Sequence, residues 1–287
     1  MQSQFIRWTP LHFDKSRYIH RVHAVLLLIL PLIMAPVQSS YAQEGSLNGE
    51  EIVKRSRDLI YEVQDQKNTV NLSLIERDGS IKKIVAIRYW RNYRATEGID
   101  SKMLLATEFP PDSRGVSFLI WDYSEKNRPD DLWLYLPALR MVRRISAQDQ
   151  NDAFLGSDLT FGDMGQRRLD EDDHTALKEE DYRGVLSYVV ESAPKEKESL
   201  YSKKISWISK ADWTILKIDY YDRNQKLLKR QTIDWQKISG LSVWKKTSVT
   251  NIQNGHRTLF EVEDLEVNIG LEDSDFTERS LKTGIKK

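Results

Sequence analysis

Cysteine is absent from the 287 residues. The fold therefore contains no disulfide bond and must rest on its hydrophobic core. The same absence excludes a thiol nucleophile and a lipid anchor on a modified N-terminal cysteine. A chain of this length can bury a core large enough to do without such covalent support.

Histidine is also scarce, with five in the chain. Three of them, His12, His20 and His23, lie close to the N-terminus, which leaves His174 and His256 in loops far apart in the sequence. Two separated histidines do not make a zinc site. The sequence also has no phosphate-binding loop, no G-x-G-x-x-G and no G-x-S-x-G. We therefore predict a protein that is not an enzyme and has no cofactor and no bound metal.

Positive and negative charges balance, because the chain has 43 Lys and Arg residues and 43 Asp and Glu residues. A nucleic-acid-binding protein would carry a strong basic surplus, so no nucleic-acid partner is predicted. The longest acidic run, Asp170 to Asp173, has consecutive ligands and lacks the glycine of a calcium loop. We interpret it as a solvated loop rather than a calcium site.

The N-terminus has the pattern of a secretory signal. Residues 1–23 carry four basic residues and one acid, and an apolar run from Ala24 to Met34 is followed by small residues ending at Ala42. That run is shorter than the ~20 residues of a spanning helix and contains Pro31. We predict a signal peptide over residues 1–42, cleavage after Ala42 and a periplasmic, soluble domain over residues 43–287.

One amphipathic helix is predicted from Asn48 to about Val63, with Asn48 as its N-cap and apolar residues at helical spacing. Its mixed polar face favours packing on a sheet over lying on a membrane. After it the chain alternates in the manner of strands with short turns, which predicts an antiparallel meander, open or partly closed. The predicted strands are 69–75, 81–89, 103–108, 116–123, 132–136, 141–145, 185–192, 203–209, 214–221, 227–235, 243–252 and 257–267.

The stretch from Asp130 to Asp163 is the most informative part of the chain. It contains a strand that is apolar on both faces, a proline that ends it, a basic segment, and a turn before a short helix over 158–165. Three runs, EFPPDSRGVSFL, DDLWLYLPALRMVRRI and FLGSDLTFGDM, resemble the outer membrane lipoprotein-sorting proteins, relatives of the carrier LolA. The resemblance implies a mainly β fold, a half-open antiparallel β-barrel with helices in or over a concave face that holds acyl chains.

The strands offer two alternative faces for ligand contact. We predict that the alternating set without polar side-chain atoms faces the groove and binds the ligand: Phe118, Ile120, Leu132, Leu134 and Leu136. Trp133 and Tyr135 carry groups that need hydrogen-bond partners, so we assign them to a rim or a partner-binding surface.

Arg140, Arg143 and Arg144 belong to the same rim assignment, where they could meet lipid phosphates or an acidic partner. The structural alternative, which we favour, pairs them with Asp158 and Asp163. The predicted function is a non-catalytic carrier for a lipid or an acylated lipoprotein, which makes transient contact with the membrane surface and has an inner-membrane transporter as a candidate partner. The alternative is an accessory protein that docks on an RND-type exporter or an envelope-stress sensor.

Overall fold

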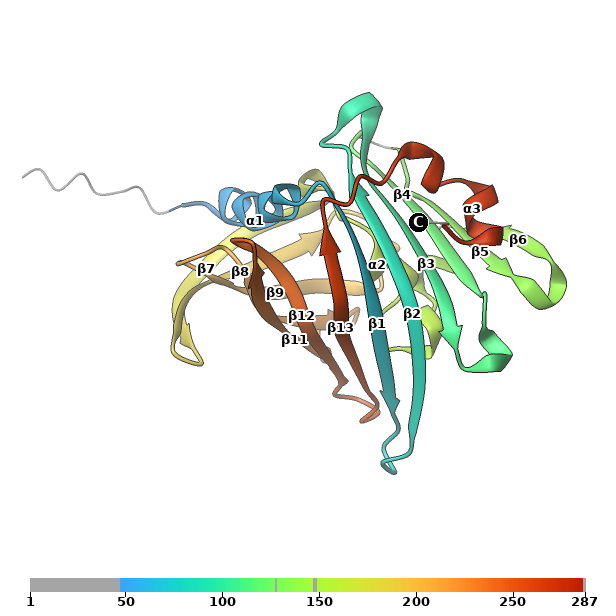
Figure 1. The fold of residues 1–287 in the computed structure, drawn as a ribbon. Coiled ribbons are helices and arrows are strands. Elements are labelled where there is room, and N and C mark those ends of the chain that lie inside the picture. The colour runs from blue at the N-terminus through green and yellow to red at the C-terminus, as the bar shows by residue number, and fades with distance from the viewer. Residues whose placement is uncertain (1–46, 127, 147–148, 286–287) are drawn as a thin grey trace, which may run out of the picture. The chain divides into compact units, whose positions relative to one another are not determined.

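The computed structural model describes residues 47–126, 128–146 and 149–285, so the predicted signal peptide and its cleavage site lie outside the described residues. Within these ranges thirteen strands form one antiparallel sheet, in the order β6-β5-β4-β3-β2-β1-β13-β12-β11-β10-β9-β8-β7. The sheet curls but does not close, because β6 and β7 remain unpaired at its two edges (Figure 1). The predicted half-open, mainly β architecture is confirmed.

The strand bounds follow the alternation in the sequence, and all twelve predicted strands are present. They are β1 Asp65–Ile75, β2 Ile81–Asn92, β3 Ile99–Phe109, β4 Ser117–Tyr123, β5 Asp131–Leu136, β6 Met141–Arg144, β7 Asp172–Tyr182, β8 Val185–Pro194, β9 Tyr201–Ser209, β10 Ile215–Asp222, β11 Leu227–Ile238, β12 Leu241–Asn251 and β13 Arg257–Val267. The prediction of an acidic loop is wrong in part, because β7 begins at Asp172. Its side chains are mostly polar and exposed, so the sequence carried no apolar alternation there.

Helix α1, Gly49–Asp58, packs on the concave face near the edge formed by β7, β8 and β9. Its N-cap is Asn48, whose side chain accepts a hydrogen bond of 2.8 Å from the backbone N–H of Glu51. Ile52 packs there against Val190 and Ile208. Gly49 lies so close to the backbone of His174 that a Cβ atom would come within 2.6 Å of it, which explains a glycine at this helix start.

The long connection between β6 and β7 enters the concave side of the sheet. It carries the short helix α2, Phe161–Met164, capped by Thr160 and Asp163 in a reciprocal capping box. Phe154, Phe161 and Met164 pack there against Phe118 and Leu105. We call residues 149–165 the inner segment.

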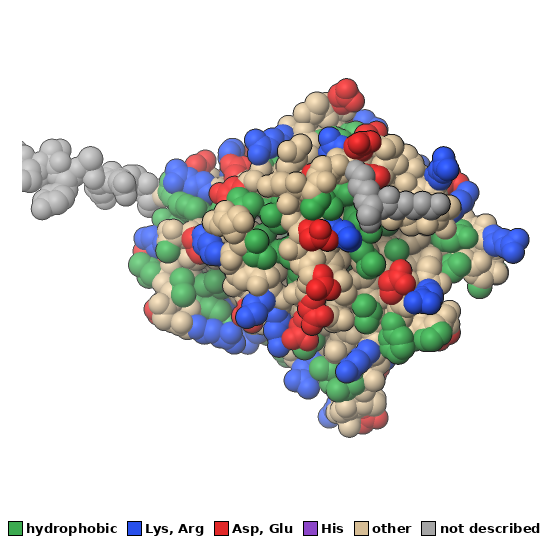
Figure 2. Space-filling view, in the orientation of Figure 1, with side chains coloured by type: hydrophobic (Ala, Val, Ile, Leu, Met, Phe, Trp, Pro, Cys, Tyr) green, Lys and Arg blue, Asp and Glu red, His purple; other side chains and the backbone are tan. Residues whose placement is uncertain are grey.

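Helix α3, Glu278–Thr283, and the chain before it cover the opposite, convex face of β2 to β5. Leu271, Phe276 and Leu281 pack against Tyr89, Leu104 and Leu119. The convex face of β13 is polar by contrast: Figure 2 shows acidic side chains gathered over this strand, which carries Glu261, Glu263, Asp264 and Glu266. Both faces of β2 to β5 are thus buried, which is why β5 is apolar in both alternating sets.

No helix within the described ranges is both long enough and apolar enough to cross a membrane.

Candidate functional site

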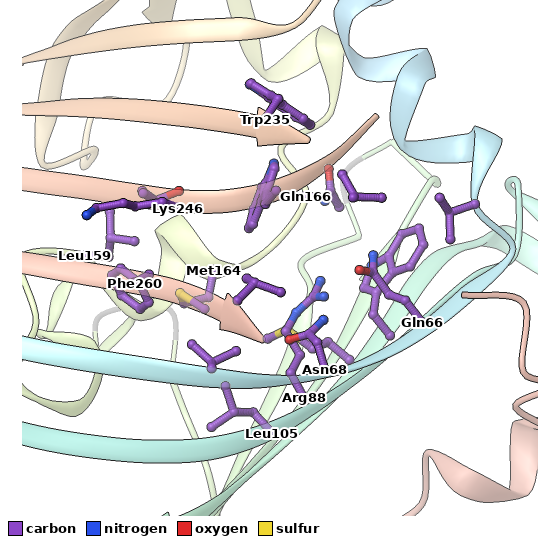
Figure 3. A pocket seen from close by; sticks show the side chains of 18 of the residues that line it. Gln66, Asn68, Arg88, Leu105, Leu159, Met164, Gln166, Trp235, Lys246 and Phe260 are labelled. Carbon is purple, nitrogen blue, oxygen red and sulfur yellow. The ribbon is translucent and has the colours of Figure 1, made fainter. Parts of the chain in front are cut away.

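A cavity of about 130 Å³ lies between the concave face of the sheet and the inner segment. Strands β1, β2, β3, β12 and β13 form one wall, and Leu159, Met164 and Gln166 form the other (Figure 3). The apolar part of the wall is mainly Val70, Trp90, Met103, Leu105, Val243 and Phe260. The lining is therefore largely apolar, as expected for a site that holds hydrocarbon.

Strand alternation explains which residues reach this cavity. Asn68 and Val70 of β1 face it, as do Arg88 and Trp90 of β2 and Met103 and Leu105 of β3. The register pairs Arg88 with Asn68 on one side and with Leu105 on the other, so these three side chains form a row across the sheet. This row was not predicted from the sequence. Arg88, which interrupts the apolar alternation of Ile84, Ala86 and Trp90, was the signal that could have revealed it.

The five residues predicted to bind ligand lie on strands β4 and β5, beside the cavity. Phe118 packs under Phe154 and Phe161, with ring centroids 4.7 Å and 5.6 Å away. Ile120 and Leu132 are buried in a cluster with Trp90 and Met103, and Leu134 packs against this cluster and against the phenylalanines. Leu136 is half-buried at the end of β5. None of the five is among the residues that line the cavity, so their contact with a ligand stays a prediction.

Trp133 and Tyr135 lie on the convex face, in the cluster covered by the C-terminal segment. Trp133 makes an edge-on contact with Trp121, with ring centroids 5.4 Å apart. The indole N–H of Trp121 donates to the carbonyl oxygen of Phe276 at 3.1 Å. A partner-binding role for Trp133 and Tyr135 stays a prediction.

The pairing predicted for the arginine cluster is wrong. Arg143 pairs with Asp149 and Arg144 with Asp131, while Arg140 is exposed in the turn between β5 and β6 with a positive φ of 49°. Both paired arginines contact acids that are near in sequence, 6 and 13 positions away. Asp158 pairs with His256 instead, and Asp163 pairs with Lys229.

Asp163 belongs to a buried network of ion pairs and hydrogen bonds between the inner segment and the sheet. Its Oδ2 atom lies 2.8 Å from Nζ of Lys229 and accepts a hydrogen bond of 2.7 Å from the hydroxyl of Tyr201. Asp158 lies 2.7 Å from Nδ1 of His256 and accepts from the hydroxyl of Thr258, also at 2.7 Å. These contacts fix the inner segment to β9, β11 and β13.

Asp122 lines the cavity from the end of β4. It accepts hydrogen bonds from the hydroxyl of Ser101 and, at 2.9 Å, from the backbone N–H of Gln166. Burial, and then the nearby carboxyl of Asp130, raises the pKa of Asp122 well above its usual range, which favours the neutral acid. Gly165 passes so close that a Cβ atom there would meet Oδ1 of Asp122 at 2.9 Å.

No group of three or more metal-ligating side chains is assembled in the part of the chain that the structure describes. His174 contacts the hydroxyl of Ser192 at 2.8 Å and the carbonyl oxygen of Leu169 at 3.1 Å, far along the chain from His256.

The fold recurs in other proteins of known structure. A family model described as an uncharacterized protein matches residues 99–283, which is more than half of the chain. No curated protein matches.

Two solved structures share 29% sequence identity and a TM-score of 0.76 with this chain. One is a domain from Vibrio parahaemolyticus assigned to the outer membrane lipoprotein-sorting proteins, with 82% of this chain and 98% of that chain covered. The other is a DUF1329 family protein from Desulfovibrio piger, with 81% and 97% covered. A LolA superfamily protein from Nitrosomonas europaea, 16% identical, matches with a TM-score of 0.63 over 82% of this chain and 99% of that chain, and shows the same fold.

Proposed function

Because the chain belongs to the LolA-like family of outer membrane lipoprotein-sorting proteins, we propose that it is a periplasmic carrier for the acyl chains of a lipid or lipoprotein. The protein binds these chains in the cavity under the inner segment and passes them toward the outer membrane without any chemical step. The observation that carries the proposal is the apolar cavity between the concave sheet and the inner segment. Export through residues 1–42 would bring the domain to the periplasm.

Burial of hydrocarbon supplies the affinity. Each methylene removed from water contributes about 0.8 kcal/mol, so a chain of ordinary length binds without a catalytic or covalent group. The cavity of about 130 Å³ is smaller than the ~300 to 1,000 Å³ of most ligand sites. An entire acyl chain therefore enters only when the inner segment moves away from the sheet, which exposes Leu134, Phe118 and their neighbours to the ligand.

Delivery requires contact with a membrane, and one end of the sheet suits that contact. Antiparallel order places the β1–β2, β3–β4, β5–β6 and β12–β13 connections at the same end. Exposed apolar side chains occupy these connections and the strand ends beside them: Ile81, Phe109, Leu139, Met141 and Ile252. Basic residues such as Arg77, Lys82 and Arg140 accompany them, and Figure 2 shows apolar and basic side chains together at this end. This combination favours an anionic lipid surface.

The test is native mass spectrometry of the full chain after export and gentle extraction from the periplasm. We expect a co-purifying lipid or acylated protein, and saturable binding of a fluorescent acyl probe after delipidation. A protein that is consistently free of ligand and also fails to bind the probe contradicts the proposal. Crosslinking in the periplasm tests the alternative function, an accessory protein that docks on an RND-type exporter or an envelope-stress sensor. A stoichiometric membrane-protein partner without bound lipid would favour that alternative.

A further inference from the structure

Arg88 extends from β2 into the cavity and has no acidic partner there. Its Nε–H points to the sulfur of Met103 at 3.2 Å, and its guanidinium carbon lies 6.0 Å from the centroid of the Trp244 ring. Within the described ranges no carboxylate oxygen lies within 4.0 Å of its nitrogen atoms. Other arginines of the fold differ, since Arg57, Arg167 and Arg230 each pair with a buried aspartate.

The acid on the same cavity wall does not neutralise Arg88. Asp122 is occupied by Ser101 and Gln166, and burial favours its neutral form. Burial also lowers the pKa of Arg88 to about 10, and Asp122 opposes that change only in part. A guanidinium with this pKa remains a cation at neutral pH. The cavity therefore contains a positive charge that no acidic group of the protein balances at contact distance.

Asn68 stands directly across from Arg88 on β1 and is a second unpartnered polar group. Its side chain is 3% exposed and its Oδ1 atom is buried without a hydrogen-bond partner in the part of the chain that is described. Figure 3 shows Asn68 and Arg88 beside one another in the cavity. A buried amide oxygen without a partner costs stability. Together with the unpaired cation of Arg88, the Asn68 amide offers a polar ligand two groups to bind on this wall of the cavity.

We propose that the cavity binds a single-chain amphipath with a carboxylate head, such as a fatty acid, whose head is held by Arg88 and Asn68. The two carboxylate oxygens match the parallel N–H groups of a guanidinium, and the Asn68 amide, turned to present Nδ2, supplies a third donor. The hydrocarbon chain then lies along Val70, Trp90 and Phe260. The small cavity favours this compact head over a bulkier phosphodiester. This inference rests on the proposed function, because it names the ligand class of the same site.

The test compares three amphipaths of equal chain length by titration calorimetry with the delipidated protein: dodecanoate, dodecyl phosphate and dodecanol. We expect dodecanoate to bind about 10- to 100-fold more tightly than dodecanol, as a charge-assisted hydrogen-bond pair provides. Arg88→Met should reduce dodecanoate binding to the level of dodecanol and leave dodecanol binding unchanged. Asn68→Ala should give a smaller loss for dodecanoate alone.

Thermal melting distinguishes this role from a structural one. A ligand-binding Arg88 is an unbalanced charge in the free protein, so Arg88→Met should keep or raise Tm, whereas loss of a structural arginine would lower it. Equal binding of dodecanoate and dodecanol, unaffected by Arg88→Met, would overturn the inference and leave the carrier function intact. Tighter, Arg88-dependent binding of dodecyl phosphate would overturn the carboxylate assignment. If none of the three amphipaths binds, the carrier function itself fails.

Discussion

The Nζ atom of Lys229 on β11 lies 2.8 Å from Oδ2 of Asp163 on α2, and the two side chains are only 3% and 4% exposed. Lys229 also donates to the carbonyl oxygen of Asp158 at 2.6 Å. Burial alone would raise the pKa of Asp163, but Lys229 and Lys204 outweigh it and hold that pKa well below its usual range. This ion pair joins the inner segment to the sheet.

Lys229→Met should lower the free energy of unfolding by about 3 kcal/mol, because the buried Asp163 would lose its nearer cation and keep only Lys204, at 3.7 Å. Urea denaturation followed by tryptophan fluorescence measures this loss. Lys54→Met is the matched control, since Lys54 pairs with Asp58 on the exposed face of α1, and the control should leave the midpoint unchanged. A Lys229→Met protein as stable as the control would show that the buried pair does not hold the inner segment.

Stability should fall as pH rises from about 4 toward the raised pKa of Asp122. In this window the unfolded chain has lost the carboxyl proton and the folded protein keeps it, so a rise in pH favours unfolding. Asp122→Asn removes this proton and should flatten the dependence between pH 5 and pH 8. Melting temperatures across that range measure the effect, and an unchanged slope in the variant would argue against a neutral Asp122.

Leu134→Glu should abolish binding of an acyl probe, because it places a charge among the apolar residues under the inner segment. Trp133→Ala alters the convex face of the same strand and should keep probe binding while lowering Tm. Probe titrations are made well below both melting temperatures, so that each variant is folded. Normal binding by Leu134→Glu together with loss of binding in Trp133→Ala would show that the ligand contacts the convex face of β5. That outcome would contradict the proposal.

A disulfide between Asp158→Cys and Thr258→Cys should prevent uptake of acyl chains by holding the inner segment on β13. The native side chains of these two residues contact one another at 2.7 Å, and the natural chain offers no other thiol. We expect the oxidised double variant to bind no probe and the reduced form to bind it. The single-cysteine variants control for loss of the Asp158 contacts. Equal uptake by the oxidised and reduced forms would show that the inner segment need not move.

The sequence predicted the parts of this fold that depend on local alternation. The pattern around Asp78–Gly79, for example, gave the hairpin between β1 and β2 correctly. It could not reveal β7, whose side chains are mostly polar and exposed, because an edge strand without a buried face has no apolar period. Nor did it indicate that the C-terminal segment around Phe276 would cover the convex face, since a short helix has little periodicity to detect.

Site residues were harder to predict, because their partners are distant in sequence. Asp163 was expected to pair with an arginine about 20 positions away, and it pairs with Lys229, 66 positions away. Arg88 is a single charge within an otherwise apolar alternating set, and its isolation depends on where Asp122 and Asn68 lie after folding. The register of the four strands β1 to β4 brings these groups to one wall.

The pairing of β1 with β13 at the centre of the sheet determines when the protein can finish folding. Thr69 and Asp264, which are hydrogen-bonded across this pair, are separated by 195 positions. Since synthesis proceeds from the N-terminus, β1 is made well before its partner β13. Contacts this distant slow folding and leave apolar strand edges exposed to aggregation in the meantime. We therefore expect a chain that ends before β13 to aggregate, because the edge of β1 that pairs with β13 would stay open.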